Sequence, residues 1–157
     1  MTVNSANPRL RLNYVAASDR GLVRGNNEDS AYAGPHLLAL ADGMGGHAGG
    51  DLASATVITE LVEIDHDSLT AAEASSQLGR AITRANDEIA RTFADNAELE
   101  GMGTTVTAIM RARNKLILAH IGDSRAYLLR DGETVLTMDT VVGSPSRPTP
   151  LLTDTIT

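Results

Sequence analysis

The sequence has no cysteine, no tryptophan and only 3% aromatic residues. The absence of cysteine excludes disulfides, thiolate metal ligands and a cysteine nucleophile. With so few aromatic side chains, a core has to be built from Leu, Ile, Val, Ala and Met. The chain also lacks an apolar run of the about 20 residues that a membrane-spanning helix requires, and residues 1–12 contain no apolar signal core. We therefore expect a cytoplasmic protein that has no membrane partner.

Basic residues are also few, because 13 Lys and Arg stand against 20 Asp and Glu, which gives a formal net charge of -7. A chain without a basic cluster is a poor candidate for binding nucleic acid, so no nucleic-acid partner is expected. Hard cations need acidic ligands, but most surface carboxylates only keep a protein in solution. The length of 157 residues is enough for one domain with its own core.

Apolar patterning predicts two strands in the first third of the chain. Residues 9–18 alternate between polar and apolar side chains, which is typical of a strand. Residues 36–41 form a short and nearly continuous apolar run, so we expect a strand that is buried on both faces.

Two helices are expected next. The first covers residues 49–64 and closely follows a glycine-rich segment. The second begins near Thr70, which forms a capping-box pattern with Glu73. Its apolar residues recur at helical spacing; they are Leu78, Ile82, Ala85, Ile89 and Phe93.

Three β-rich runs follow, at residues 101–112, 115–122 and 125–132. The pair Asp131 and Gly132 is a strong tight-turn signal and predicts one more short strand after it. Short connections of this kind join antiparallel neighbours. Because the two helices lie together between strands, the sequence predicts an α+β fold with helices packed on a sheet face.

The segment of residues 37–50 combines an apolar run, the carboxylate of Asp42 and then five glycines within residues 43–50. One interpretation is a dinucleotide site, since residues 43–48 fit G-x-G-x-x-A between a strand and a helix. Asp42 would then face the pyrophosphate, and no acidic residue ends a second parallel strand about 20 positions later. Another interpretation is structural, with glycines that let the strand turn sharply into the helix. It leaves unexplained the charge of Asp42 at the end of a buried strand.

A third interpretation is a site for a hard cation such as Mg²⁺ or Mn²⁺, which prefers carboxylate, carbonyl and water oxygens. Asp42 supplies one carboxylate, and Gly43 can turn its carbonyl toward the same ion. Glu28 and Asp29 lie on an earlier loop, and Asp123 again ends an apolar run beside a glycine. Carboxylates that converge on one sheet edge repel each other unless an ion neutralises them.

Four segments in this order resemble the metal-dependent protein phosphatases of the PPM type, also called protein phosphatase type 2C, and most of all their bacterial branch. The segments are RGLVRGNNEDS (20–30), LLALADGMGGHAGG (37–50), GMGTTVTA (101–108) and HIGDSRAYLLRDG (120–132). The resemblance covers residues 11–137 and implies an antiparallel β-sandwich flanked by helices. It also implies protein serine/threonine phosphatase activity by a two-metal-activated water, with phosphorylated proteins as substrates.

The resemblance also assigns roles to residues. It implies two Mn²⁺ or Mg²⁺ ions, bridged by Asp42, with the Gly43 carbonyl on one of them. Glu28 would hold metal-bound water, and Asp29 would lie in the outer shell. The remaining two assignments are Arg24 as the clamp on the substrate phosphate and Asp123 as the ligand of a third, looser ion.

The leaving alkoxide needs a proton, and some family members carry a histidine directly after the Asp-Gly pair, where this chain has Met44. His47 is the available general acid, and a structural hydrogen bond near the helix start is an equal alternative for it. His120 lies on a strand, and we expect it in the core.

The family pattern does not continue after residue 137, because neither a Ser-Asp-Gly nor an Asp-Asn motif follows. Residues 139–157 are rich in proline and threonine and are expected to be an extended or disordered tail. Residues 9–138 would then be the N-terminal part of a phosphatase domain that is incomplete at its C-terminus. The alternative function is a truncated, inactive phosphatase or a non-catalytic phosphoprotein-binding remnant.

Overall fold

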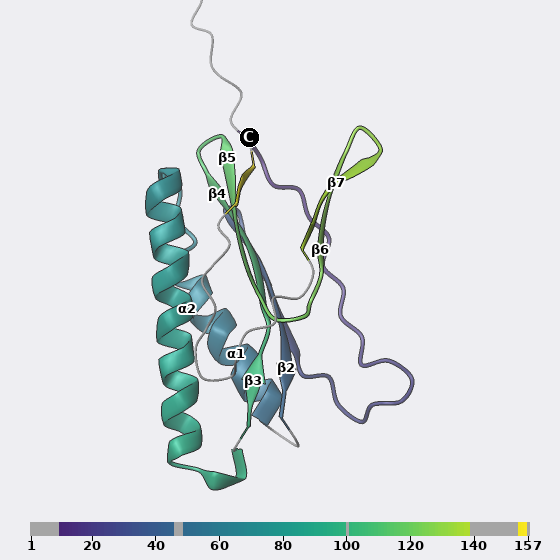
Figure 1. Ribbon diagram of the computed structural model, residues 1–157, viewed down its shortest axis with the longest axis vertical. Helices are drawn as coiled ribbons and strands as arrows, with labels where there is room; N and C mark the ends of the chain where they lie inside the picture. The colour runs from purple at the N-terminus through teal and green to yellow at the C-terminus, as the bar shows by residue number, and fades with distance from the viewer. Residues whose placement is uncertain (1–9, 46–48, 100, 139–153, 157) are drawn as a thin grey trace, which may run out of the picture.

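Two helices lie on one side of an antiparallel sheet in the computed structural model, which describes residues 10–45, 49–99, 101–138 and 154–156 (Figure 1). The first elements are β1 (Asp29–Ala33), β2 (Leu37–Met44), α1 (Gly49–Val62), α2 (Ala71–Ala94) and the short 3₁₀ helix η1 (Ala97–Leu99). They are followed by β3 (Gly103–Thr104), β4 (Val106–Ala112), β5 (Lys115–Ile121), β6 (Ala126–Arg130), β7 (Glu133–Met138) and β8 (Asp154–Ile156).

The larger sheet has the strand order β1-β2-β4-β5-β8, with β3 paired to β2, and its pairings are antiparallel. Neighbours along the chain pair through short turns, as β1 does with β2 and β4 with β5, whereas β2 and β4 are brought together by the two helices between them. The predicted α+β class with an antiparallel sheet and flanking helices is thereby confirmed.

The core lies between this sheet and the helices. Side chains alternate across a strand, so one face of each central strand points at the helices. Two rows cross that face in register, Leu37–Met110–Ile117 and Ala39–Ala108–Ala119. The alanine row lets the helices approach closely, and the core is completed from the helices by Val57, Leu61, Ala74, Leu78, Ala81, Ile82 and Ala85.

Helix α2 confirms the capping pattern read from the sequence. The Glu73 N–H donates to Thr70 Oγ1 at 3.3 Å, and the Thr70 N–H donates to Glu73 Oε2 at 2.8 Å. The Thr70 N–H and the Thr70 hydroxyl both donate to the Glu73 carboxylate, and these two bonds hold the pKa of Glu73 below its usual range. Leu78, Ile82 and Ala85 are buried as expected, whereas Phe93 near the end of the helix is 38% exposed.

Two expectations about the strands are wrong. Residues 36–41 are not buried on both faces, because β2 alternates between buried and accessible residues and Leu40 is 41% exposed. The helices cover only one face of this strand. Residues 10–18, the described part of the first expected strand, form no regular structure. Alternation creates a strand only where backbone partners are present, and none pairs with this segment among the described residues.

Strands β6 and β7 form a separate two-stranded sheet, which lies on the other side of the six-stranded sheet from the helices in Figure 1. Asp131 and Gly132 have φ angles of 53° and 81°. Two successive positive φ angles are typical of a type I′ hairpin turn, so the turn predicted from this pair is confirmed.

Most of the proline- and threonine-rich segment (139–153 and 157) lies outside the described residues, and Asp154–Ile156 pairs with β5 as β8.

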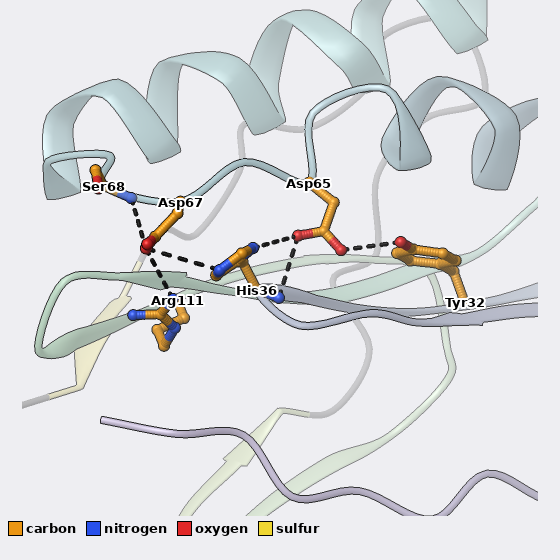
Figure 2. Close-up of polar contacts among 6 residues, drawn as sticks. All are labelled: Tyr32, His36, Asp65, Asp67, Ser68 and Arg111. Atoms are coloured by element: carbon orange, nitrogen blue, oxygen red, sulfur yellow. Dashed lines mark hydrogen bonds and ion pairs between the residues drawn. The ribbon is translucent and has the colours of Figure 1, made fainter. Parts of the chain in front are cut away.

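A polar cluster fastens the connection between α1 and α2 to the sheet (Figure 2). Asp65 accepts from the Tyr32 hydroxyl at 2.9 Å and bonds His36 Nδ1 at 2.9 Å. Asp67 accepts from the Arg111 guanidinium at 2.9 Å. The hydrogen bond to Asp65 and burial raise the pKa of Tyr32. The cluster therefore joins strands β1 and β4 to the loop between α1 and α2, which is not part of the hydrogen-bonded sheet.

None of the helices in the described part of the chain is both long and apolar enough to cross a membrane.

Candidate metal centre

A cavity of about 370 Å³ lies beside the last residues of β2 and the turn after β5. Its walls hold five residues that the sequence had indicated, together with three others. The lining residues are Arg24, Glu28, Asp42, Gly43, Met44, Gly45, Thr105 and Asp123. Segments separated by about a hundred residues thus contribute acidic groups and one guanidinium to the same space.

Asp42 is exposed while its neighbours Ala41 and Gly43 are buried, because β2 alternates up to its end. Both its backbone N–H and its backbone carbonyl are hydrogen-bonded. The Asp42 N–H donates to Thr105 Oγ1 at 3.0 Å, and the Asp42 carbonyl accepts from the Thr105 N–H at 2.9 Å and from Thr104 Oγ1 at 3.0 Å. The strand end is therefore fixed by its backbone, which leaves the carboxylate at the cavity.

The electrostatics of Asp42 reveal crowded negative charge. Partial burial raises the pKa of its carboxyl, and the charge of Asp29 and a hydrogen bond shared with Asp29 raise it further. Asp123 adds a smaller effect in the same direction, and Arg24 opposes it. Asp29 is the register partner of Asp42 in the pairing of β1 with β2. A bound cation would relieve this repulsion.

Glu28 is packed against the start of α1. Its carbonyl accepts from the Gly43 N–H at 3.2 Å and from Ser54 Oγ at 2.7 Å, and its carboxylate accepts from Asn26 Nδ2 at 2.9 Å. Ser54 is fully buried. These contacts set both the backbone and the carboxylate of Glu28 before any ligand is present.

The glycines of residues 43–50 serve this close packing. A Cβ on Gly43 would overlap the backbone of Gly50 and of Glu28, and a Cβ on Gly50 would overlap the Glu28 carboxylate. Gly45 has a φ of +123° and lies against the backbone of Met102. The structural interpretation of the glycines therefore holds at these positions, and it is compatible with an ion beside Asp42. His47, expected as a general acid, lies outside the described residues.

Asp123 lies in the turn after β5, between Gly122 and Ser124. Gly122 has a φ of +98°, and the Thr105 side chain occupies the space that a Cβ there would need. The candidate ligands in the cavity are carboxylate and carbonyl oxygens, which suit Mg²⁺ or Mn²⁺. No three acidic or histidine side chains within the described residues are placed so that they hold an ion by themselves. Backbone carbonyls, waters or further ligands would complete the coordination.

Sequence reasoning missed the contribution of Thr105, which lines the cavity and is 6% exposed. The sequence predicted a β-rich run at residues 101–112 and assigned no polar role to Thr105. The buried position of His120 is confirmed, at 3% exposed, with Nδ1 bonded to Thr107 Oγ1 at 2.9 Å.

The Protein phosphatase 2C family profile matches residues 26–156. The chain belongs to this family. It is 56% identical over 131 residues to the serine/threonine protein phosphatase PstP of Mycobacterium tuberculosis, an alignment that covers 83% of this chain and 25% of PstP. It is 36% identical over 122 residues to the serine/threonine phosphatase stp of Listeria monocytogenes, covering 73% of this chain and 48% of the relative.

Solved structures agree with this assignment. The catalytic domain of PstP in complex with two manganese ions superposes with a TM-score of 0.75 at 55% identity, covering 80% of this chain and 55% of that domain. The chain thus spans about half of that domain, and at most about half the length of the two relatives. Membership of this family favours the cation interpretation of the glycine segment over the dinucleotide interpretation.

Proposed function

We propose that this chain forms the N-terminal part, residues 9–138, of a metal-dependent protein serine/threonine phosphatase domain. The observation that carries the proposal is the shared cavity, in which Asp123 meets Arg24, Glu28 and Asp42 although it lies far from them in the sequence. The substrates would be phosphoserine and phosphothreonine residues of phosphorylated proteins. The manganese ions of the PstP catalytic domain support a two-metal site of this kind.

In this proposal the carboxylates of the cavity hold two Mn²⁺ or Mg²⁺ ions. Asp42 would bridge them and Gly43 would offer its carbonyl. Glu28 would contribute through water, with Asp29 farther out and Asp123 as ligand of a looser third ion. When bound, such a pair of ions lowers the pKa of a water so that hydroxide is available near neutral pH.

The side chains of this chain would then bind and neutralise the substrate. Arg24 presents a planar guanidinium that can form two parallel hydrogen bonds with a phosphoryl group. Its charge opposes that of the acidic residues, which is visible in its effect on the pKa of Asp42. His47 is proposed as the general acid that returns a proton to the departing serine or threonine oxygen.

Hydrolysis of p-nitrophenyl phosphate by the purified chain tests this function. We expect hydrolysis that depends on Mn²⁺ and is lost in Asp42→Asn. Asp87→Asn is the matched control, because Asp87 is exposed on α2 and does not line the cavity. This variant should hydrolyse the substrate as fast as the wild type. Activity that is equal in Asp42→Asn and in the wild type would contradict the proposed role of Asp42. A folded chain without Mn²⁺-dependent activity would contradict hydrolysis by this chain on its own.

A further inference from the structure

Thr105 touches both acidic segments of the cavity. Its hydroxyl accepts from the Asp42 N–H at 3.0 Å and shares a hydrogen bond with Ser124 Oγ at 2.7 Å. Its N–H donates to the Asp42 carbonyl at 2.9 Å. The Thr105 methyl group lies where a Cβ on Gly122 would stand. One nearly buried side chain therefore contacts the strand end that carries Asp42 and both neighbours of Asp123.

These contacts form a chain of hydrogen bonds from the Asp42 backbone through Thr105 to Ser124. A hydroxyl has one proton and two acceptor lone pairs, so Thr105 can serve Asp42 and Ser124 at once. Valine has the same shape but neither capability. Removing the hydroxyl would take one acceptor from the Asp42 N–H and would cut the link to the turn, while the packing against Gly122 stays.

The hydrogen bonds through Thr105 oppose the repulsion between Asp42 and Asp123. The carboxylates of Asp42 and Asp123 line one cavity, and like charges favour separation. Asp123 is exposed in a turn, so nothing in its own burial keeps it near Asp42. The contacts of Ser124 and Gly122 with Thr105 oppose that separation from each side of Asp123.

We propose that Thr105 is a positioning residue whose hydroxyl holds the Asp42 strand end and the Asp123 turn together, and thereby sets the affinity of the cavity for a divalent cation. This inference rests on the proposed function in one respect, since the cation is the ligand. The hydrogen-bond link itself exists in the metal-free chain and can be tested there.

The first experiment measures the Mn²⁺ dissociation constant of the full chain by isothermal titration calorimetry. Loss of a partner that orients a metal ligand weakens metal affinity about 10- to 100-fold, and we expect this range for Thr105→Val. Thr105→Ser keeps the hydroxyl and should restore binding to near the wild-type value. Thr107→Val is the matched control, because it also removes a threonine hydroxyl from this part of the chain. The Thr107 hydroxyl bonds His120, and Thr107 does not line the cavity.

A double-mutant cycle separates positioning from general loss of stability. Ser124→Ala removes the same hydrogen bond from the other side, so it should weaken Mn²⁺ binding in the wild type and have no further effect in Thr105→Val. If Thr105→Val does not fold, Ser124→Ala alone still carries the test. Mn²⁺ affinity that is unchanged in both Thr105→Val and Ser124→Ala would overturn the inference.

The second experiment needs no metal. Ser124→Ala should shift the NMR resonance of the Asp42 amide through Thr105, and this response should vanish in the Thr105→Val background. An Asp42 amide that does not respond to Ser124→Ala overturns the inference. A wild-type chain that binds no Mn²⁺ would contradict the proposed function instead, and the amide response would then decide the positioning role independently.

Discussion

Asp29 and Asp42 stand directly opposite each other in the antiparallel pairing of β1 with β2. Like charges at such a position destabilise a sheet, and here the charge of Asp29 helps to raise the pKa of Asp42. A sheet that needed only stability would not keep this pair. If a cation binds beside Asp42 as proposed, it would relieve this repulsion.

The first prediction follows from this pair. The pKa of Asp42 is higher in the folded state than in the unfolded state, so folding is favoured while the carboxyl is protonated. This contribution to stability is lost as the pH rises from the pKa of the unfolded state through that of the folded state. Asp42→Asn should therefore raise the melting temperature of the metal-free chain near neutral pH and change it little at acidic pH. Thermal denaturation at the two pH values checks this.

The same variant should lose the increase in melting temperature that Mn²⁺ gives the wild type, since a ligand stabilises only the state that binds it. An Asp42→Asn chain that melts below the wild type without metal, at neutral pH, would count against the repulsion. A variant that Mn²⁺ still stabilises to the wild-type extent would count against Asp42 as a ligand.

The sequence predicted best those features whose causes are local. The capping box of Thr70 and Glu73 spans four residues, and the turn at Asp131 and Gly132 spans two, so neighbouring residues are enough to define them. Helix periodicity also identified Leu78 and Ile82 as buried. Asp42 and Asp123 became candidate ligands for a similar reason, since each ends an apolar run beside a glycine.

Features that depend on distant partners could not be read in this way. The apolar run of residues 36–41 looks buried from both sides, but exposure depends on what covers each face of the sheet. The alternating residues 10–18 need a neighbouring strand that local pattern does not supply. Thr105 is separated from Asp42 by 63 positions, and nothing in its own neighbourhood signals the contact.

A second prediction concerns Asp67 in the cluster of Figure 2. The hydrogen bond from the Ser68 N–H, and then that from Arg111, hold the pKa of Asp67 below its usual range. A depressed pKa contributes stability that is present above the unfolded pKa and is lost as the pH falls through the folded one. Asp67→Asn should thus lower the free energy of unfolding near neutral pH, with a difference that closes on acidification.

Urea denaturation over a pH series measures this effect, with Asp87→Asn as the surface control. A constant difference between Asp67→Asn and the wild type at every pH would mean that the side chain acts through packing and not through its charge.

The third prediction concerns the start of α2. Removing an N-cap hydroxyl costs about 1 kcal/mol, so Thr70→Ala should lower the free energy of unfolding by about that amount. Thr83→Ala is the matched control, because Thr83 lies inside the same helix and its hydroxyl donates to the Gly79 carbonyl in the preceding turn. Alanine is the better helix former there by up to about 0.7 kcal/mol. Equal losses in the two variants would refute the capping role.

The last prediction links the glycine segment to the site. Gly50 is buried at the start of α1, where any Cβ would overlap the Glu28 carboxylate. Gly50→Ala should therefore displace Glu28 and lower the free energy of unfolding by about 1–3 kcal/mol, the usual cost of overpacking. If Glu28 contributes to cation binding, Mn²⁺ affinity should fall as well.

Gly25→Ala is the control, since a Cβ there meets no atom within 4 Å. Urea denaturation measures the loss of stability, and calorimetric titration with Mn²⁺ measures the loss of affinity. Lower stability with unchanged Mn²⁺ affinity would remove Glu28 from the site and leave Gly50 a purely structural role.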